Sequence, residues 1–214
     1  DLESRRKEIT SVVAGGRVLV VGGAGSIGAA TVRELTAFRP AALHVVDLNE
    51  NGLAELVRDL RSGSLNVPEF RALPLDFGSP AMERLLLGEK PYDLVLNFAA
   101  LKHVRSEKDV PSILQMLDTN VLKPAKLLRW ISPKRFFSVS TDKAADPVSL
   151  MGASKRIMEQ VVFSAAPHAT SARFANVAFS AGSLLESFLH RIDKRQPLAV
   201  PRATKRYLIT LEES

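Results

Sequence analysis

The segment from Arg17 to Phe38 constrains the fold more than any other part of this sequence. An apolar run, Arg17 to Val21, leads directly into the glycine-rich stretch Gly22-Gly23-Ala24-Gly25-Ser26-Ile27-Gly28. Apolar residues at helical spacing follow from Ile27 to Phe38, ahead of Pro40. A strand, a glycine loop and a helix in this order place backbone N–H groups and a helix N-terminus where a pyrophosphate can bind. Because a lone glycine triplet is more often an ordinary turn, the rest of the chain has to supply supporting evidence.

Further short apolar runs alternate with helix-length amphipathic stretches along the chain, a pattern typical of a parallel sheet covered by helices on both faces. The runs predicted to form strands are Arg17 to Val21, Leu43 to Val46, Phe70 to Pro74, Leu94 to Phe98, Arg135 to Val139 and Ser171 to Phe174. The stretches predicted to form helices are Ile27 to Phe38, Asn51 to Arg61, Pro111 to Trp130 and Ser149 to Phe163. The predicted fold class is therefore α/β, a Rossmann-type doubly wound parallel sheet.

The pattern changes after Phe179, where the alternation of strands and helices ends. A helix from Leu184 to Lys194 and a strand near Leu198 to Val200 are predicted there. We expect an N-terminal extension over residues 1–16, a dinucleotide-binding Rossmann domain over 17–178, and the start of a small substrate-binding lobe over 179–214 that this chain does not complete.

Composition excludes several classes of site. Cysteine is absent, which rules out disulfides, thiolate metal sites and a cysteine nucleophile. No apolar run approaches the roughly 18 residues that a membrane span needs, so we expect no membrane segment in this chain. A cytoplasmic location is expected, although a longer native protein is free to carry a membrane anchor. No metal is expected either, because no ligand spacing links the histidines, which are His44, His103, His168 and His190.

The chain is basic, with a formal net charge of +6 and a pI near 9.8. Its single Trp and two Tyr residues, with no stacking motif, argue against nucleic-acid binding. Basic residues gather near the C-terminus, at Arg191, Lys194, Arg195, Arg202, Lys205 and Arg206. Such a cluster favours an anionic ligand such as a diphosphate, and a solvated basic face is an equally good interpretation.

Asp47 indicates which dinucleotide binds. It ends the second predicted strand, about 20 residues after Gly28, where a carboxylate accepts hydrogen bonds from both ribose hydroxyls. The same carboxylate would repel the 2′-phosphate of NADP, and neither Leu48, Asn49 nor Glu50 offers the arginine that NADP calls on. We therefore expect NAD rather than NADP, and we count Asn49 with Asp47 as a cofactor contact.

Further cofactor contacts are predicted where the next strands end. Asp76 can reach the adenine amine and Phe77 can cover the ring, with a loop aspartate that caps the next helix as the equal alternative. After the fourth strand, Asn97, Ala99 and Ala100 leave room for a cofactor at the sheet edge. Asn120, in a predicted helix, either hydrogen-bonds backbone or is a tolerated polar residue.

Two motifs follow the fifth predicted strand: Ser140-Thr141-Asp142-Lys143 and Met151-Gly152-Ala153-Ser154-Lys155. Together with the glycine loop and Asn97-Phe98-Ala99-Ala100, they resemble an extended short-chain dehydrogenase/reductase. Ala99-Ala100-Leu101-Lys102-His103-Val104 and Arg173-Phe174-Ala175-Asn176-Val177 narrow the resemblance. Within that superfamily the chain looks like the CapD-like UDP-N-acetylglucosamine 4,6-dehydratases of polysaccharide biosynthesis, over nearly its whole length.

The resemblance implies a reaction in which C4 of the sugar is oxidised, the C5 proton is removed, C6 loses its hydroxyl as water, and the hydride returns to C6. It implies that Asp142 is the acid, Lys143 the base, and Ser140 and Lys155 cofactor contacts. Without that context, a strand-end salt bridge or a helix cap is an alternative for Asp142.

Met151 is a departure from most of the superfamily, which has tyrosine there. A thioether does no acid or base work, and the branch that this chain resembles has methionine at this position. The C4 hydroxyl proton then leaves through Lys155, Thr141 or a water molecule.

Substrate contacts are predicted at Lys102 and His103, which follow the fourth strand, and at Asn176 and Arg206. The last two rest on the resemblance alone, which implies a UDP-sugar substrate and a homo-oligomer. A nucleotide-sugar 4-epimerase and an inactive NAD-binding protein are the alternative functions.

Overall fold

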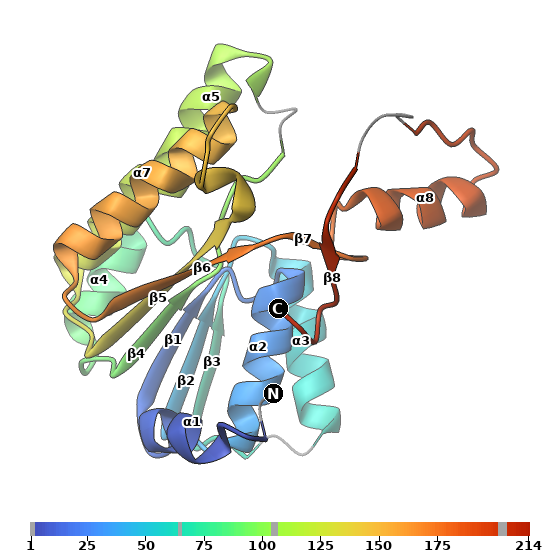
Figure 1. Ribbon diagram of the computed structural model, residues 1–214. Helices are drawn as coiled ribbons and strands as arrows, with labels where there is room; N and C mark the ends of the chain where they lie inside the picture. The colour runs from blue at the N-terminus through green and yellow to red at the C-terminus, as the bar shows by residue number, and fades with distance from the viewer. Residues whose placement is uncertain (1–2, 64–65, 104–106, 201–204) are drawn as a thin grey trace.

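The computed structural model describes residues 3–63, 66–103, 107–200 and 205–214. Val104 and Arg202, named above, lie outside the described residues. A six-stranded parallel sheet in the order β3-β2-β1-β4-β5-β6 forms the centre (Figure 1). Its strands are β1 Arg17–Val21, β2 Ala42–Val46, β3 Glu69–Leu73, β4 Leu94–Asn97, β5 Arg135–Thr141 and β6 Ala169–Phe174. This order confirms the predicted doubly wound fold. The sequence order of the strands reverses between β1 and β4, although the two strands are parallel.

Helices cover both faces of the sheet (Figure 1). On one face lie α1 Arg6–Val13, α2 Ser26–Ala37 and α3 Glu50–Ser62. On the other face lie α4 Pro80–Gly88, α5 Val110–Leu117, α6 Lys123–Trp130 and α7 Leu150–Ala165. A π-helical turn, η2 Asp118–Leu122, joins α5 to α6, so the single helix predicted over 111–130 carries a local widening.

The alternation of side chains along β1 explains the two layers. Val18 and Val20 belong to the core under α1, α2 and α3, whereas Leu19 and Val21 belong to the core under α4, α6 and α7. Successive strand residues point to opposite faces, so a strand that is apolar throughout has to be buried on both sides. All six predicted strands are confirmed, with shifts of a few residues at their ends.

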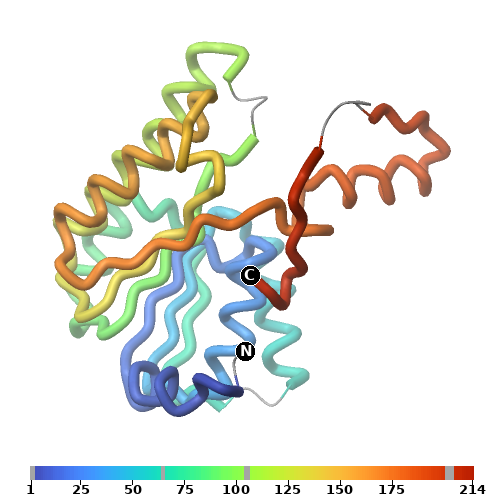
Figure 2. The backbone as a smooth tube through the Cα atoms, viewed as in Figure 1, coloured from blue at the N-terminus to red at the C-terminus, as the bar shows by residue number. Residues whose placement is uncertain are grey.

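The segment after β6 is built differently. It forms β7 Asn176–Val177, α8 Leu184–Asp193 and β8 Leu208–Ile209, with β7 and β8 paired in parallel. Figure 2 shows the chain leaving β6 and crossing the ends of the central strands before it reaches β7. The prediction of a strand near Leu198 to Val200 was wrong, because those residues are irregular and the short pairing forms at β8 instead. Among the described helices, none has the length and apolar character of a membrane span.

Candidate active site

A cavity of about 950 Å³ lies along the carboxyl ends of the strands. Its walls come from the ends of the central strands, the start of α7, and residues 174–185 of the segment that leads into α8. Ligands of open α/β sheets bind at this edge, where the strand order reverses. Small-molecule sites span roughly 300–1,000 Å³, so this cavity has room for a large ligand.

The glycine loop forms the floor of the cavity beside β1. Gly22 has a φ of +77°, a conformation that favours glycine. A Cβ at Gly22 would lie 2.4 Å from the backbone nitrogen of Ala99, and a Cβ at Gly28 would lie 2.2 Å from the Gly22 carbonyl oxygen. Gly25 is the N-cap residue of α2, so the loop delivers the helix N-terminus to the cavity. The loop residues that line the cavity are Gly22, Gly25, Ser26, Ile27 and Gly28.

Asp47 lies just beyond β2 and lines the cavity. Its Oδ2 accepts a hydrogen bond from the backbone N–H of Ala24 at 2.9 Å, and its Oδ1 accepts one from the N–H of Asn49 at 2.9 Å. The carboxylate is therefore fixed beside the glycine loop. The Asn49 side chain instead caps α3 by accepting from the N–H of Gly52 at 3.0 Å, and Asn49 is not among the described residues that line the cavity.

Asp76 and Phe77 line the cavity beyond β3. The Asp76 carboxylate accepts from Lys123 Nζ at 2.7 Å and from the N–H of Gly78 at 2.9 Å, while Ser79 caps α4. Burial disfavours the charged form of Asp76, but the bonds from Lys123 and Gly78 outweigh it and lower its pKa. Lys123 also lines the cavity, and sequence reasoning missed it because Lys123 and Asp76 lie far apart in the chain.

Two buried asparagines shape the loop after β4. Asn97 accepts from the N–H of Ala99 at 3.2 Å, and Asn120 accepts from the N–H of Leu101 and donates to its carbonyl, both at 2.9 Å. Asn120 sits in the π-helical turn and does hydrogen-bond backbone, although in a distant loop and not in its own helix. Neither asparagine is among the described residues lining the cavity; the loop residues that do line it include Ala99, Ala100 and Leu101.

Ser140, near the end of β5, lines the cavity and donates to Glu159 Oε1 at 2.6 Å. Arg173 of β6 binds both oxygens of the same carboxylate, at 2.9 and 2.6 Å. The hydrogen bond from Arg173 lowers the pKa of Glu159, so this buried group is ionised at neutral pH. Glu159 was missed by sequence reasoning, although its place one helical turn after Lys155 put both on one face of α7.

The Thr141-Asp142-Lys143 run spans the end of β5 and a 3₁₀ turn, Asp142–Ala144. Asp142 Oδ1 accepts from the Thr141 hydroxyl at 2.8 Å and from Lys143 Nζ at 2.9 Å. Burial disfavours ionised Asp142, but the bonds from Lys143 and Thr141 outweigh it and lower its pKa. Thr141 and Lys143 line the cavity; among the described lining residues Asp142 does not appear. The strand-end ion pair is thus present, and its Lys143 partner lines the cavity.

Met151 and Lys155 come from the first turns of α7, both buried and both lining the cavity. Burial lowers the pKa of Lys155 to about 8, and the charge of Glu159 opposes that shift. Glu107 fixes the start of the helix by accepting from the backbone N–H of Met151 at 2.9 Å. A substantial fraction of Lys155 is therefore a neutral amine near pH 8.

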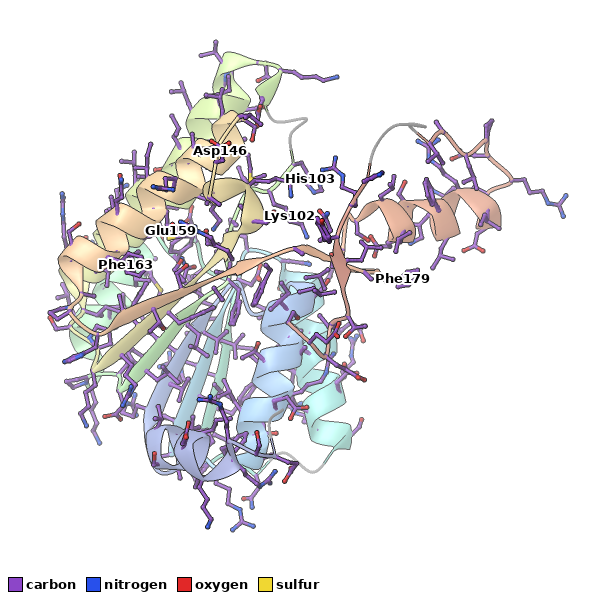
Figure 3. The ribbon with its side chains drawn as sticks, in the orientation of Figure 1. Lys102, His103, Asp146, Glu159, Phe163 and Phe179 are labelled. Carbon is purple, nitrogen blue, oxygen red and sulfur yellow. The ribbon has the colours of Figure 1, made fainter. Side chains whose placement is uncertain are left out.

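The predicted substrate residues come from three segments, and all four line the cavity: Lys102, His103, Asn176 and Arg206. Figure 3 shows Lys102 and His103 next to each other, facing β8. The side chain of Lys102 is exposed, yet desolvation at the cavity lowers its pKa, and the negative charge of Glu186 opposes that shift. The amide of Asn176 donates to the Tyr207 carbonyl at 3.3 Å, next to Arg206.

The comparisons with known proteins agree with this geometry. Residues 18–214 match the family model described as polysaccharide biosynthesis protein. The chain belongs to this family. It is 32% identical to an uncharacterised membrane protein of Methanocaldococcus jannaschii, over 92% of this chain and 60% of that protein. It is 31% identical to the capsular polysaccharide biosynthesis protein CapD of Staphylococcus aureus, over 92% of this chain and 34% of CapD. The chain thus spans between a third and two thirds of these relatives.

A solved structure shares the fold. It is DesIV of Streptomyces venezuelae, a dTDP-glucose 4,6-dehydratase with NAD and TYD bound, with a TM-score of 0.74 and 24% identity over 92% of this chain and 69% of DesIV. The family match and this fold confirm the resemblance to a CapD-like extended short-chain dehydrogenase/reductase.

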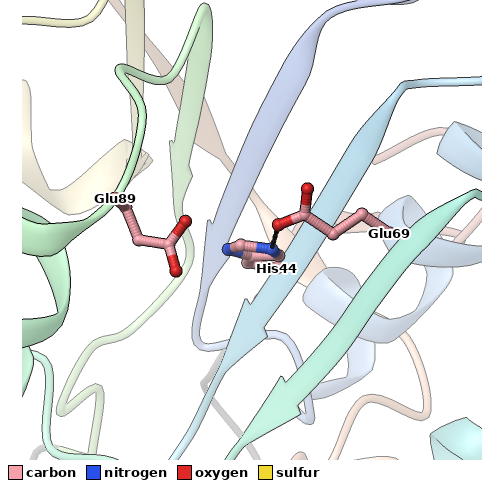
Figure 4. A group of neighbouring side chains, drawn as sticks. All are labelled: His44, Glu69 and Glu89. Carbon is pink, nitrogen blue, oxygen red and sulfur yellow. Dashed lines mark hydrogen bonds and ion pairs between the residues drawn. The ribbon is translucent and has the colours of Figure 1, made fainter.

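This member of the polysaccharide biosynthesis family also contains a polar cluster of a buried histidine and two partly exposed glutamates, none of which is among the described residues lining the cavity (Figure 4). His44, Glu69 and Glu89 bring possible ligand atoms within 4.8 Å of one another, which the sequence spacing did not reveal. His44 Nδ1 lies 2.7 Å from the Tyr92 hydroxyl and Nε2 lies 2.8 Å from Glu69. Both carboxylates pair with Arg17, so the cluster is already satisfied as a structural network.

Proposed function

We propose that this chain is the NAD-binding part of a nucleotide-sugar 4,6-dehydratase that converts UDP-N-acetylglucosamine to a UDP-4-keto-6-deoxy sugar. The observation that carries the proposal is that Lys143 and Lys155 line one cavity with the glycine loop, while Lys143 holds Asp142 in an ion pair. Residues 17–178 form the cofactor domain in this proposal, and residues 179–214 form part of the substrate lobe.

The residues present fit NAD. A Cβ at Gly22 or Gly28 would collide with backbone atoms, so only glycine allows the loop to pack this closely and α2 to present its N-terminus there, as a pyrophosphate requires. Asp47 presents a fixed carboxylate for the ribose hydroxyls and disfavours NADP. When bound, NAD supplies the chemistry that the side chains lack, accepting hydride from C4 of the sugar and returning it at C6.

Lys155 is the group that takes the C4 hydroxyl proton. Met151 has no acid or base function, and the Thr141 hydroxyl is already committed to Asp142. Lys155 is buried against the cavity with a pKa near 8, so its neutral amine is available as a base at mildly alkaline pH.

Asp142 and Lys143 carry out the elimination as a pair. Transfer of one proton from the Lys143 ammonium to the Asp142 carboxylate leaves a neutral amine and a carboxylic acid, with no change in net charge. That form is the one required: Lys143 removes the C5 proton and Asp142 protonates the departing C6 oxygen. Exclusion of water by bound substrate favours the neutral form over the ion pair.

The substrate side of the cavity is cationic. Lys102 and Arg206 line it from two different segments, and His103 lies beside Lys102. Cations at these positions suit the diphosphate of a nucleotide sugar.

The test is to incubate the protein, with its native N- and C-terminal sequence, with NAD and UDP-N-acetylglucosamine and to take a mass spectrum of the sugar nucleotide. Loss of one water without net NADH supports dehydration. An unchanged mass with a new isomer means a 4-epimerase, and folded protein that binds NAD without conversion means an inactive NAD-binding protein; either result overturns the proposal. A matched variant, Lys143→Met, keeps NAD binding and loses the dehydrated product.

A further inference from the structure

Lys123 is a buried cation that lines the cavity and takes no part in the proposed reaction. Its side chain lies over Gly78, where a Cβ would come within 2.4 Å of Lys123 Cγ. Its Nζ lies 2.7 Å from Asp76 Oδ2 and 3.5 Å from Asp118 Oδ2. Nζ also lies 5.8 Å from the centroid of the Phe77 ring. The ammonium group is therefore held at one point in the cavity wall.

That point lies at the base end of a dinucleotide site. The glycine loop after β1 suits the pyrophosphate and Asp47 after β2 suits the ribose, so the adenosine half extends toward the end of β3. Asp76 and Phe77 lie directly beyond β3, and Lys123 contacts both. This placement rests on the proposed binding of NAD.

The chemistry of the Asp76–Lys123 pair matches one base. A carboxylate only accepts hydrogen bonds and an ammonium only donates them. Along its Watson–Crick edge, adenine presents the N6 amine, a donor, next to the ring nitrogen N1, an acceptor. An acceptor and a donor set side by side, next to the flat face of Phe77, are complementary to that edge. We propose that Lys123 is the donor half of an adenine-reading pair whose acceptor half is Asp76.

A purely structural task, neutralising Asp76 and Asp118, is the competing explanation, and it makes a different prediction. A structural lysine acts on every dinucleotide alike. A lysine that hydrogen-bonds adenine raises the affinity only for a base whose edge is intact. An analogue with a blocked edge therefore distinguishes the structural explanation from the base-reading one.

The experiment compares NAD with its etheno derivative, in which a bridge joins N1 and N6 of the adenine and removes both the amine hydrogens that Asp76 would accept and the N1 acceptor for Lys123. Affinities for both are measured by isothermal titration calorimetry for the unmodified protein, Lys123→Met and Lys126→Met. Lys126 is the matched control, because its charge also acts on Asp76 although it is exposed and is not among the described residues lining the cavity. Asp76→Asn, which preserves side-chain size, is the second variant and covers the case in which Lys123→Met does not fold.

The unmodified protein is expected to prefer NAD. Lys123→Met is expected to lose about tenfold in NAD affinity, as removal of a hydrogen bond to a charged group implies, with little change for the etheno derivative. Asp76→Asn should likewise reduce the preference for NAD over the etheno derivative. Lys126→Met should leave that preference unchanged. Equal weakening of both ligands by Lys123→Met, or an unchanged preference in Asp76→Asn, overturns the inference. If the unmodified protein binds neither ligand, the proposed function itself fails.

Discussion

Along the ends of β1 to β3, protein groups hold one another in place: Asp47 binds two backbone N–H groups, and Asp76 binds Lys123 and the N–H of Gly78. Across the cavity, α8 has no buried residue, and Tyr207 beside β8 is 87% exposed. The cofactor side is thus built before any ligand arrives, whereas the substrate side leaves its cations turned toward the cavity. Substitutions on the first side should weaken NAD binding, and substitutions on the second should weaken only the binding of the sugar nucleotide.

The largest effect is expected from Gly28→Ala. Its Cβ would lie 2.2 Å from the Gly22 carbonyl oxygen, so the loop has to shift out of the shape that accepts a pyrophosphate. NAD affinity, measured by calorimetry, should fall below detection. Gly88→Ala is the control, because no heavy atom lies within 4 Å of a Cβ there. If Gly28→Ala kept its NAD affinity, the claim that the glycine loop is already in its binding conformation before NAD binds would be contradicted.

Lys155→Met should come next. Loss of a general base costs typically 10²–10⁴-fold in rate, so turnover should fall within that range. The substitution replaces a buried amine with an apolar side chain, so the melting temperature should not fall. Lys134→Met, at an exposed side chain, is the control. Turnover close to that of the control would move the proton-accepting role to Thr141 or to water, and Thr141→Val would then be the variant to test.

The pH dependence of the same step should depend on Glu159. The fraction of neutral Lys155 increases as pH rises through its pKa, so kcat/KM, which reports groups of the free enzyme, should rise through about pH 8. The Glu159 carboxylate raises the pKa of Lys155, and therefore Glu159→Gln should move this rise to lower pH. Exposed Glu34, changed to Gln, is the control. A profile that stays in place, or moves to higher pH, would show that Glu159 does not influence Lys155.

The smallest effect is expected from Lys102→Ala on the substrate side. An exposed cation that contacts a diphosphate contributes modestly to substrate binding, so KM should rise several-fold with kcat nearly unchanged, as removal of uniform binding implies. NAD affinity should not change. A fall in NAD affinity instead would place Lys102 on the cofactor side and break the division between the two sides.

The sequence predicted that the glycine loop and Asp47 lie together at one edge of the sheet, because these signals are local. Gly22, Gly28 and Asp47 lie within one strand–helix–strand unit, and the fold rules bring them together. Other contacts join residues from different elements, so no sequence spacing predicts them. Examples are Lys123 with Asp76 and Glu159 with Arg173.

The strand prediction near Leu198 to Val200 failed for a related reason. The observed pairing of β7 with β8 involves two residues on each strand, too few for an alternation pattern to appear. Asn49 stays a predicted cofactor contact; its side chain caps α3, which the sequence did not indicate, because a cap depends on side-chain direction.

The most direct test of the central claim follows the hydride from C4 to C6. The substrate is UDP-N-acetylglucosamine labelled with deuterium at C4, and the product is analysed by mass spectrometry and NMR. The account requires a product that has lost water and carries the deuterium at C6, with no net NADH, because the cofactor side stores the hydride and returns it. An isomer that keeps the deuterium at C4 and the full mass, or deuterium that accumulates in NADH, would contradict it.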